Sequence, residues 1–280
     1  MSEPTVVFLH IGKTGGTTLR RVLRRQYTES EMMVVRARAR PREETLADFA
    51  ELPEAERARP RLILGHTVFG LHELVPRPST YITLLRRPVS LVLSQYGFVR
   101  RTPGHRHHQA AQGMGLEEYL ASGLAQEMNN SQTRALAGAV DVPYGENPPE
   151  LLELAKRNVE EHFRVVGLTE RFDESLVLFG LAFGWSRLSY VRANVASKRV
   201  VPSPAGLAEI ERLNALDLEL YDWAERRLQA TIDGEPRFAA AYSRFERRNR
   251  LYQPWGKVTY TLPKRLHTRL QAPRSAGEPA

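Results

Sequence analysis

The chain has 280 residues, with 40 Lys and Arg against 32 Asp and Glu, and a formal net charge of +8 at pH 7. The lack of cysteine excludes disulfides, thiolate metal sites and cysteine nucleophiles. The longest apolar runs have only the length of a strand, so we expect no membrane span, and the positive balance favours acidic ligands.

The first predicted elements are a strand at Val6–His10 and an arginine-rich helix at Thr17–Tyr27, joined by a loop of Lys, Thr and Gly. Free backbone N–H groups and the positive end of the helix dipole meet at such a junction. The glycines let the backbone approach an oxyanion closely, and the lysine ammonium and threonine hydroxyls add donors. This junction predicts a phosphate or sulfate site.

The order of residues in this loop does not fit the nucleotide-triphosphate P-loop, G-x-x-x-x-G-K-[ST]. Gly12–Thr14 imitates the end of that motif, but the motif needs a further glycine where this chain has the apolar run of its first strand. Lys13 also precedes the glycine pair instead of following it. A P-loop kinase that acts on a small molecule with ATP and magnesium remains an alternative, although no acidic strand end suited to the metal is evident.

The next predicted strands are Leu62–Leu64 and Tyr81–Leu85, and a helix is expected at Pro88–Arg100. A proline suits the first turn of a helix. Arg86 ends the second of these strands, and Ser94 lies about two helical turns further on, on the face that can look back at it. The alternative is an arginine that caps its strand and a serine satisfied within its own helix.

The remaining expected elements are helices at Leu116–Ser122, Pro149–His162, Asp173–Phe183 and Ala205 to about Gln229, and a strand at Arg164–Gly167. Strands that alternate with helices, without a dividing linker, predict a single α/β domain over residues 1–263. Its expected architecture is a P-loop-like fold with a central parallel sheet flanked by helices. Residues 264–280, basic and then small and polar, are expected to be mostly disordered.

Arginines cluster at Arg20–Arg25, Arg36–Arg40 and Arg100–Arg101. Each cluster is either a solvated face or part of an anion site. No zinc-finger spacing, RNA-binding signature or aromatic interleaving accompanies them, so we expect no nucleic-acid partner.

Several segments carry a resemblance to a known family. Residues 10–18 read HIGKTGGTT, residues 129–138 contain N-x-Q-x-R-x-L, and residues 163–172 and 213–221 add a late strand and a closing helix. In these segments the chain resembles the carbohydrate sulfotransferases that use 3′-phosphoadenosine 5′-phosphosulfate (PAPS), and above all the heparan sulfate 2-O- and 6-O-sulfotransferases. The likeness extends over nearly the whole chain.

The resemblance implies which residues bind the nucleotide. In the family the H-I-x-K-T-G-G-T-T loop grips the 5′-phosphosulfate, and an arginine and a serine hold the 3′-phosphate. The expected cofactor-binding residues are therefore Lys13, Thr14, Gly15, Gly16, Thr17, Thr18, Arg86 and Ser94, with Ser197 as a further candidate over the adenine and 3′-phosphate. The family has aspartate where this chain has Arg87, and we expect that change to alter a neighbouring ion pair only.

Sulfuryl transfer to a hydroxyl needs a proton acceptor and charge stabilisation on the departing phosphate oxygen. Histidine titrates near neutrality, and His66 follows an apolar strand at the edge expected to carry both anion loops. The family places its catalytic histidine in a comparable turn, so His66 is the predicted base and His72 the reserve. The alternative for His66 is a structural hydrogen bond. His10 is expected to pack or hydrogen-bond at its strand end, or to contact the acceptor.

The histidines of residues 105–108 form a loop that suggests a metal, but no carboxylate or fourth ligand is suitably spaced beside them. We expect no metal here and a loop that faces solvent or the acceptor. Lys13 is the second predicted catalytic residue, because its ammonium would stabilise the bridging oxygen as 3′,5′-ADP leaves.

The sequence thus predicts an enzyme, a PAPS-dependent sulfotransferase acting on a hydroxyl-bearing acceptor, by resemblance a glycan or glycoconjugate. A non-catalytic polyanion-binding module that keeps the nucleotide site as a relic is a further alternative. The first strand begins close to the start of the chain, and cysteine is absent, so a soluble, cytoplasmic relative of bacterial type is expected.

Overall fold

The computed structural model describes residues 3–36, 42–66, 69–139, 141–191 and 200–270. It contains a five-stranded sheet in the order β2-β3-β1-β4-β5, in which every neighbouring pair is parallel. The strands are β1 (Thr5–Leu9), β2 (Met32–Arg36), β3 (Leu62–His66), β4 (Ser79–Leu85) and β5 (Phe163–Leu168). The predicted α/β fold with a central parallel sheet is confirmed.

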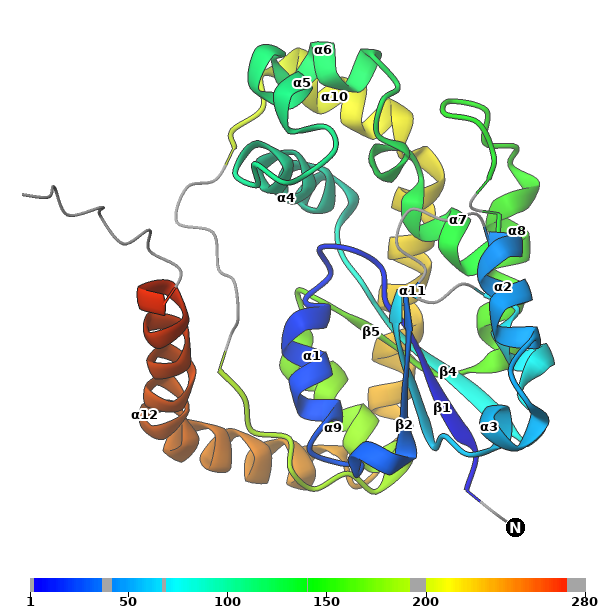
Figure 1. Cartoon of the computed structure of the whole chain (residues 1–280), viewed down its shortest axis with the longest axis vertical. Helices are drawn as coiled ribbons and strands as arrows, with labels where there is room; N and C mark the ends of the chain where they lie inside the picture. The colour runs from blue at the N-terminus through cyan, green and yellow to red at the C-terminus, as the bar shows by residue number, and fades with distance from the viewer. Residues whose placement is uncertain (1–2, 37–41, 67–68, 140, 192–199, 271–280) are drawn as a thin grey trace, which may run out of the picture.

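Helices cover both faces of this sheet (Figure 1). Helices α1 and α9 lie on one side, and α7, α8 and α11 pack together on the other. The bounds of the helices are α1 (Gly16–Leu23), α2 (Arg42–Ala50), α3 (Glu54–Ala58), α4 (Pro88–Arg100), α5 (His108–Gly113), α6 (Leu116–Ala121), α7 (Ser131–Ala137), α8 (Glu150–His162), α9 (Phe172–Phe183), α10 (Pro204–Leu213), α11 (Ala215–Asp233) and α12 (Phe238–Leu270). Within the described ranges, no helix is both long and apolar enough to cross a membrane.

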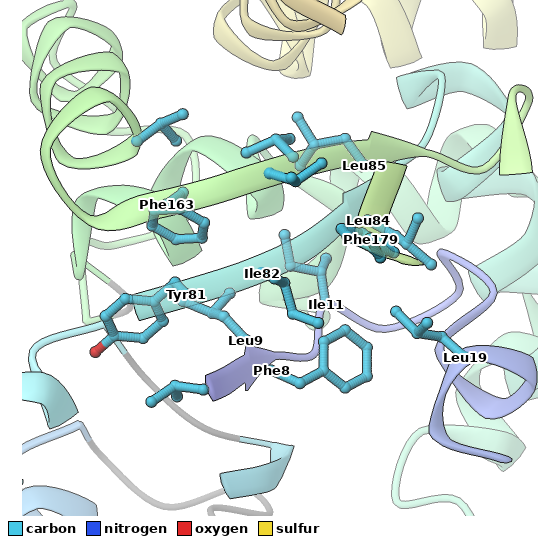
Figure 2. Packing of buried hydrophobic residues seen from close by; sticks show 14 of the residues in the cluster. Phe8, Leu9, Ile11, Leu19, Tyr81, Ile82, Leu84, Leu85, Phe163 and Phe179 are labelled. Carbon is cyan, nitrogen blue, oxygen red and sulfur yellow. The ribbon is translucent and has the colours of Figure 1, made fainter. Parts of the chain in front are cut away.

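The main core lies between the sheet and its helices. All five residues of β1 are buried, as expected for a central parallel strand covered on both faces. Figure 2 shows Phe8 and Ile82 from adjacent strands, with Leu19 of α1 and Phe179 of α9 close to the sheet. Burial of each such side chain contributes about 1.5–3 kcal/mol, so this core fixes the position of the loops that follow the strands.

A smaller apolar cluster joins α4, α5, α6 and α10 beyond the carboxyl ends of the strands (Figure 1). Val92 and Tyr96 of α4 pack there with Tyr119 of α6 and Ile210 of α10. This cluster stands over the edge of the sheet at which parallel folds bind ligands.

Two predicted helices differ from the structure. The helix expected from Ala205 to Gln229 is two helices, because Asn214 leaves helical geometry and its side-chain amide donates to the carbonyls of Ile210 and Met128. Helix α1 ends at Leu23, not at Tyr27, because the amides of Arg25 and Gln26 turn back to carbonyls only three residues earlier.

The last helix, α12, was not predicted from the sequence. It changes direction part-way along its length (Figure 1), which fits a helix with Pro254 in its interior. It runs to Leu270 and so reaches into the predicted tail of residues 264–280; residues 271–280 lie outside the described part of the chain.

Gly65 occupies a position in β3 that only glycine fits. Its φ is +134°, and a Cβ atom there would lie 1.9 Å from the carbonyl oxygen of Val35 in β2. We expect Gly65→Ala to lower the free energy of unfolding by about 3 kcal/mol, through backbone strain and the steric clash. Urea unfolding with Gly104→Ala as control tests this, since a Cβ on Gly104 would meet no atom within 4 Å. Equal midpoints for the two variants would contradict the prediction.

Candidate active site

The site begins where β1 runs into α1. Two residues of the connecting loop have left-handed backbones, Lys13 with φ 64° and Gly15 with φ 85°. Gly15 is the N-cap of α1, so the free N–H groups of the first helical turn open onto this loop. Left-handed residues at this spacing turn successive N–H groups toward a common point, which is a typical anion-binding arrangement.

The hydroxyl of Thr14 holds the loop together instead of facing outward. Thr14 is fully buried, and its Oγ1 donates to the carbonyl of Ile11 at 2.8 Å. Thr169, just after β5, donates to the carbonyl of Thr14 at 2.8 Å and so ties the loop to the neighbouring strand end. Of the two threonines that follow the glycines, Thr17 is exposed and Thr18 is buried. Thr14 can therefore serve an anion through its backbone while its hydroxyl supports the turn.

Three cations meet at this loop. The Arg86 guanidinium donates from Nη1 to the carbonyl of Lys13 at 2.8 Å. The Lys13 ammonium lies 4.1 Å from the centre of the Phe98 ring. Burial, followed by the positive charges of Arg101 and Arg86, lowers the pKa of Lys13 to about 8. A lysine held among arginines in a half-buried position is the electrostatic signature of a site for an anion.

Arg86 is fixed by a residue that sequence reasoning did not assign to the site. Its backbone N–H donates to Oε1 of Gln132 at 2.8 Å, and Nε2 of Gln132 donates to the Arg86 carbonyl at 2.9 Å. Gln132 lies in α7, whose N-terminus is held by buried Asp217 of α11, which accepts from the amides of Gln132 and Thr133. The N-x-Q-x-R-x-L segment marked Gln132 in the sequence, but not its partner.

Ser94 is half-buried on α4, the helix that follows Arg86. Its hydroxyl makes no hydrogen bond to any part of the chain that the structure describes, so it is not satisfied within its own helix. Ser197, the further candidate, lies outside the described residues.

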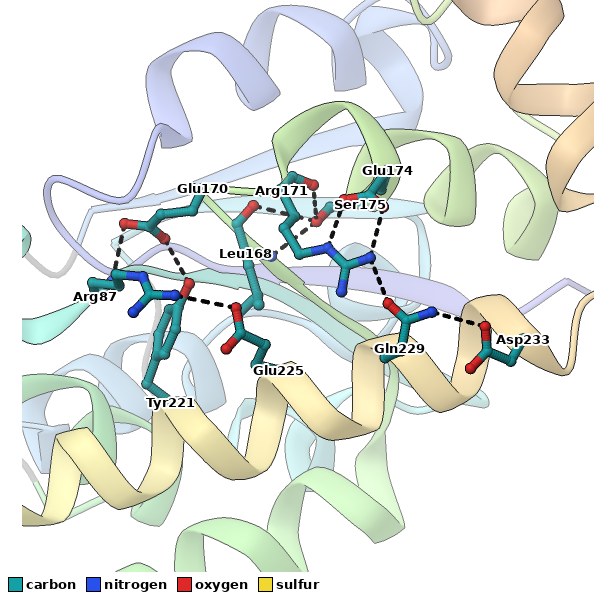
Figure 3. Close-up of polar contacts among 10 residues, drawn as sticks. All are labelled: Arg87, Leu168, Glu170, Arg171, Glu174, Ser175, Tyr221, Glu225, Gln229 and Asp233. Atoms are coloured by element: carbon teal, nitrogen blue, oxygen red, sulfur yellow. Dashed lines mark hydrogen bonds and ion pairs between the residues drawn. The ribbon is translucent and has the colours of Figure 1, made fainter.

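The Arg87 side chain points toward Tyr221 and Glu225 of α11 (Figure 3). Its Nη2 lies 3.4 Å from a carboxylate oxygen of Glu225 in α11, and its guanidinium lies over the ring of Tyr221. Its backbone N–H donates to Glu170, which also accepts from the hydroxyl of Tyr221. The ion pair with Glu225 lies at the surface, so Arg87 joins α11 to the strand ends and does not contribute a guanidinium to the anion loop.

His66 lies beside the anion loop, as the last residue of β3. The prediction that β3 ends at Leu64 and that His66 sits in a turn is wrong, because Val35 and Arg36 of β2 extend the pairing to Gly65 and His66. The His66 ring stacks on the ring of His10, with centroids 4.9 Å apart. This placement sets an imidazole next to the residue that leads into the anion loop.

The reserve histidine, His72, lies elsewhere. Its Nδ1 is 3.1 Å from the hydroxyl of Tyr81, and its ring lies 4.2 Å from that of His162. In the sheet register Tyr81 is level with Val7, the middle residue of β1, and with Phe163, the first residue of β5. His66 therefore lies at the anion loop, and His72 lies away from it.

The loop of residues 105–108 borders the site through Phe98. The ring of His105 meets the Phe98 ring edge-on at 5.9 Å, and His107 follows at 5.7 Å from His105. Among the residues that the structure describes, no group of three or more His, Asp or Glu side chains is placed to hold a metal ion.

Comparison with known proteins fits this arrangement. The family model described as galactose-3-O-sulfotransferase matches residues 2–253. Galactose-3-O-sulfotransferase 3 of Bos taurus is 31% identical over an alignment of 240 positions, gaps included, that covers 78% of this chain and 55% of that protein. Heparan-sulfate 6-O-sulfotransferase 1 of Gallus gallus is 29% identical over an alignment of 283 positions, gaps included, that covers 80% of this chain and 65% of that protein.

The chain thus spans between about half and two thirds of the length of these relatives. The resemblance to carbohydrate sulfotransferases is confirmed, with the galactose-specific family added to the heparan sulfate enzymes that the sequence motifs suggested. The family model matches about nine-tenths of the residues, so the chain belongs to the galactose-3-O-sulfotransferase family.

Proposed function

We propose that this protein transfers the sulfuryl group of PAPS to a carbohydrate hydroxyl, with His66 as general base and Lys13 as the group that stabilises the leaving oxygen. The observation that carries the proposal is the meeting of Lys13, Arg86 and the N-terminus of α1 at one loop, with a histidine pair beside it. The similarity to enzymes named for galactose and for heparan sulfate supports a glycan acceptor.

In the proposed reaction an acceptor oxygen attacks sulfur in line with the bond that joins the sulfuryl group to the 5′-phosphate. The new S–O bond forms as the old one breaks, His66 takes the proton of the hydroxyl, and 3′,5′-ADP leaves. Lys13 offsets the negative charge that grows on the departing phosphate oxygen. The backbone N–H groups from Lys13 to Thr18 hold the 5′ end, and Arg86 and Ser94 hold the 3′-phosphate.

The nucleotide assignment is tested by thermal unfolding with added ligand. We expect 3′,5′-ADP to raise Tm by mass action well above the effect of equimolar ADP or of ATP with magnesium. Arg86→Ala is expected to lose about 1.5–3 kcal/mol of 3′,5′-ADP binding, the value of a charge-assisted hydrogen bond. Equal stabilisation by ADP would contradict the role of Arg86 and Ser94, and a larger effect of ATP with magnesium would favour a kinase.

The pKa of Lys13 gives this binding a pH dependence of known sign. With a pKa lowered to about 8 in the free protein, Lys13 loses its charge as the pH rises through that value. The affinity for 3′,5′-ADP is therefore expected to fall above pH 8, by up to about tenfold per unit, with net proton uptake on binding. Calorimetric titrations at pH 7 to 9.5, in buffers of different ionisation enthalpy, measure the affinity and the number of protons taken up. Lys13→Met serves as the control, and a flat affinity in the unchanged protein would contradict the prediction.

A further inference from the structure

His10 occupies a place that neither the nucleotide contacts nor the proposed proton transfer explains. It follows β1 directly, between the central strand and the anion loop. We propose that His10 is a positioning residue, whose ring holds the imidazole of His66 in place and links it to the nucleotide loop. The inference rests on the proposed function, because it concerns the same base.

The sheet register places the two histidines side by side. Leu9 of β1 pairs with Gly65 of β3, and the residue that follows each of them in the chain is a histidine. Their rings stack at 4.9 Å with an interplanar angle of 25°. On the same face of its strand, Phe8 stacks on His10 at 5.2 Å and 23°. Rings in this series cannot tilt independently, so His10 limits the orientations open to His66.

The His10 ring is also held by α1, the helix whose N-terminus faces the anion loop. A Cβ atom on Gly16 would lie 2.0 Å from Nε2 of His10, which means that the ring packs directly on the first residue of α1. Gly16 is a glycine with ordinary backbone geometry, so its lack of a side chain serves this close approach. The His10 ring thus contacts both the helix N-terminus and the ring of the proposed base.

His10 is poorly suited to be the base itself. Its Nδ1 is buried and has no hydrogen-bond partner among the residues that the structure describes. Burial, followed by the charges of His66 and Arg20, lowers its pKa to about 3, so the ring stays neutral near pH 7. A neutral ring does not compete for the proton of the acceptor, and its face attracts the imidazolium that His66 becomes.

The test compares His10→Ala, which removes the ring, with His10→Phe, which keeps a flat ring without nitrogens. We expect His10→Ala to lower turnover at saturating PAPS and acceptor by about 10- to 100-fold, because a misplaced base loses its alignment. The Kd for 3′,5′-ADP should stay close to that of the unchanged protein. His10→Phe should recover most of the lost turnover, since stacking and not proton exchange is the proposed role.

A second readout does not depend on activity. The ring-current effect of a stacked neighbour moves the His66 Cε1 proton upfield in nuclear magnetic resonance spectra, so this signal should move downfield in His10→Ala and stay near its original position in His10→Phe. Unchanged turnover in His10→Ala, or an unmoved signal, overturns the proposal. So does a His10→Phe variant as inactive as His10→Ala. If no acceptor is sulfated at all, the proposed function fails, while the signal still decides whether His10 holds His66.

Discussion

His66→Ala is expected to reduce sulfuryl transfer by about a hundredfold or more while leaving nucleotide binding nearly intact, because a positioned general base typically contributes 10²–10⁴-fold. The expectation follows from where His66 lies, at the carboxyl end of β3 and stacked beside the residue that enters the anion loop. Its proposed partner is the acceptor hydroxyl, so the affinity for 3′,5′-ADP has no reason to change. The rate of transfer at saturating PAPS that carries a radiolabelled sulfuryl group, with a panel of glycans as acceptors, measures the effect.

His72→Ala is the matched control for this variant. His72 is also near a strand of the same sheet, but it lies among Tyr81, Phe69 and His162. It should retain most of the turnover. Circular dichroism of both variants checks that the fold is intact. Should His72→Ala be the inactive protein and His66→Ala the active one, the base has been assigned to the wrong histidine.

The second large effect is expected at Lys13. Replacing it with alanine should lower turnover by about 10²–10³-fold, the range seen when one preorganised group that stabilises developing negative charge is removed. The Lys13 ammonium lies in a half-buried position close to Arg86 and Arg101, where its interaction with an anion is screened less than at an open surface. Turnover at saturating substrates separates this effect from weaker binding.

Thr17→Ala provides the comparison for Lys13→Ala. Thr17 belongs to the same loop and helix start but is exposed, and its hydroxyl carries no charge. We expect its loss to affect turnover much less. A Lys13→Ala protein with normal turnover would mean that another cation, Arg86 or Arg101, stabilises the leaving group.

The parts of the fold with strong local signals were predictable. Helix α4 has the predicted bounds, Pro88–Arg100, because a proline begins it and an apolar sequence continues it. Strand β2 escaped prediction since it lies at the sheet edge, where Val34 stays exposed. Helix α12 was missed because its basic sequence and internal Pro254 gave no clear helical pattern.

The candidate site divides in the same way. Lys13, Arg86 and His66 could be found because each lies at or just beyond the carboxyl end of an apolar strand, and parallel strands bring these ends to one edge. The residues that hold Arg86 in place could not be predicted. Gln132 and Asp217 are 85 positions apart in the chain and meet only because α7 packs on α11. The inward turn of the Thr14 hydroxyl likewise depends on the backbone path of the finished loop.

The contacts around Arg86 also affect when the anion loop can fold during synthesis of the chain. The anion loop lies near the start of the chain, but it is braced by Thr169, and Arg86 is braced through Gln132 by Asp217. During synthesis the early strands leave the ribosome long before α11 does, so nascent chains that end before Asp217 lack this brace. Contacts of such sequence separation form late and slowly. Nucleotide binding should therefore appear only when the chain is nearly complete, which makes it a reporter of finished folding.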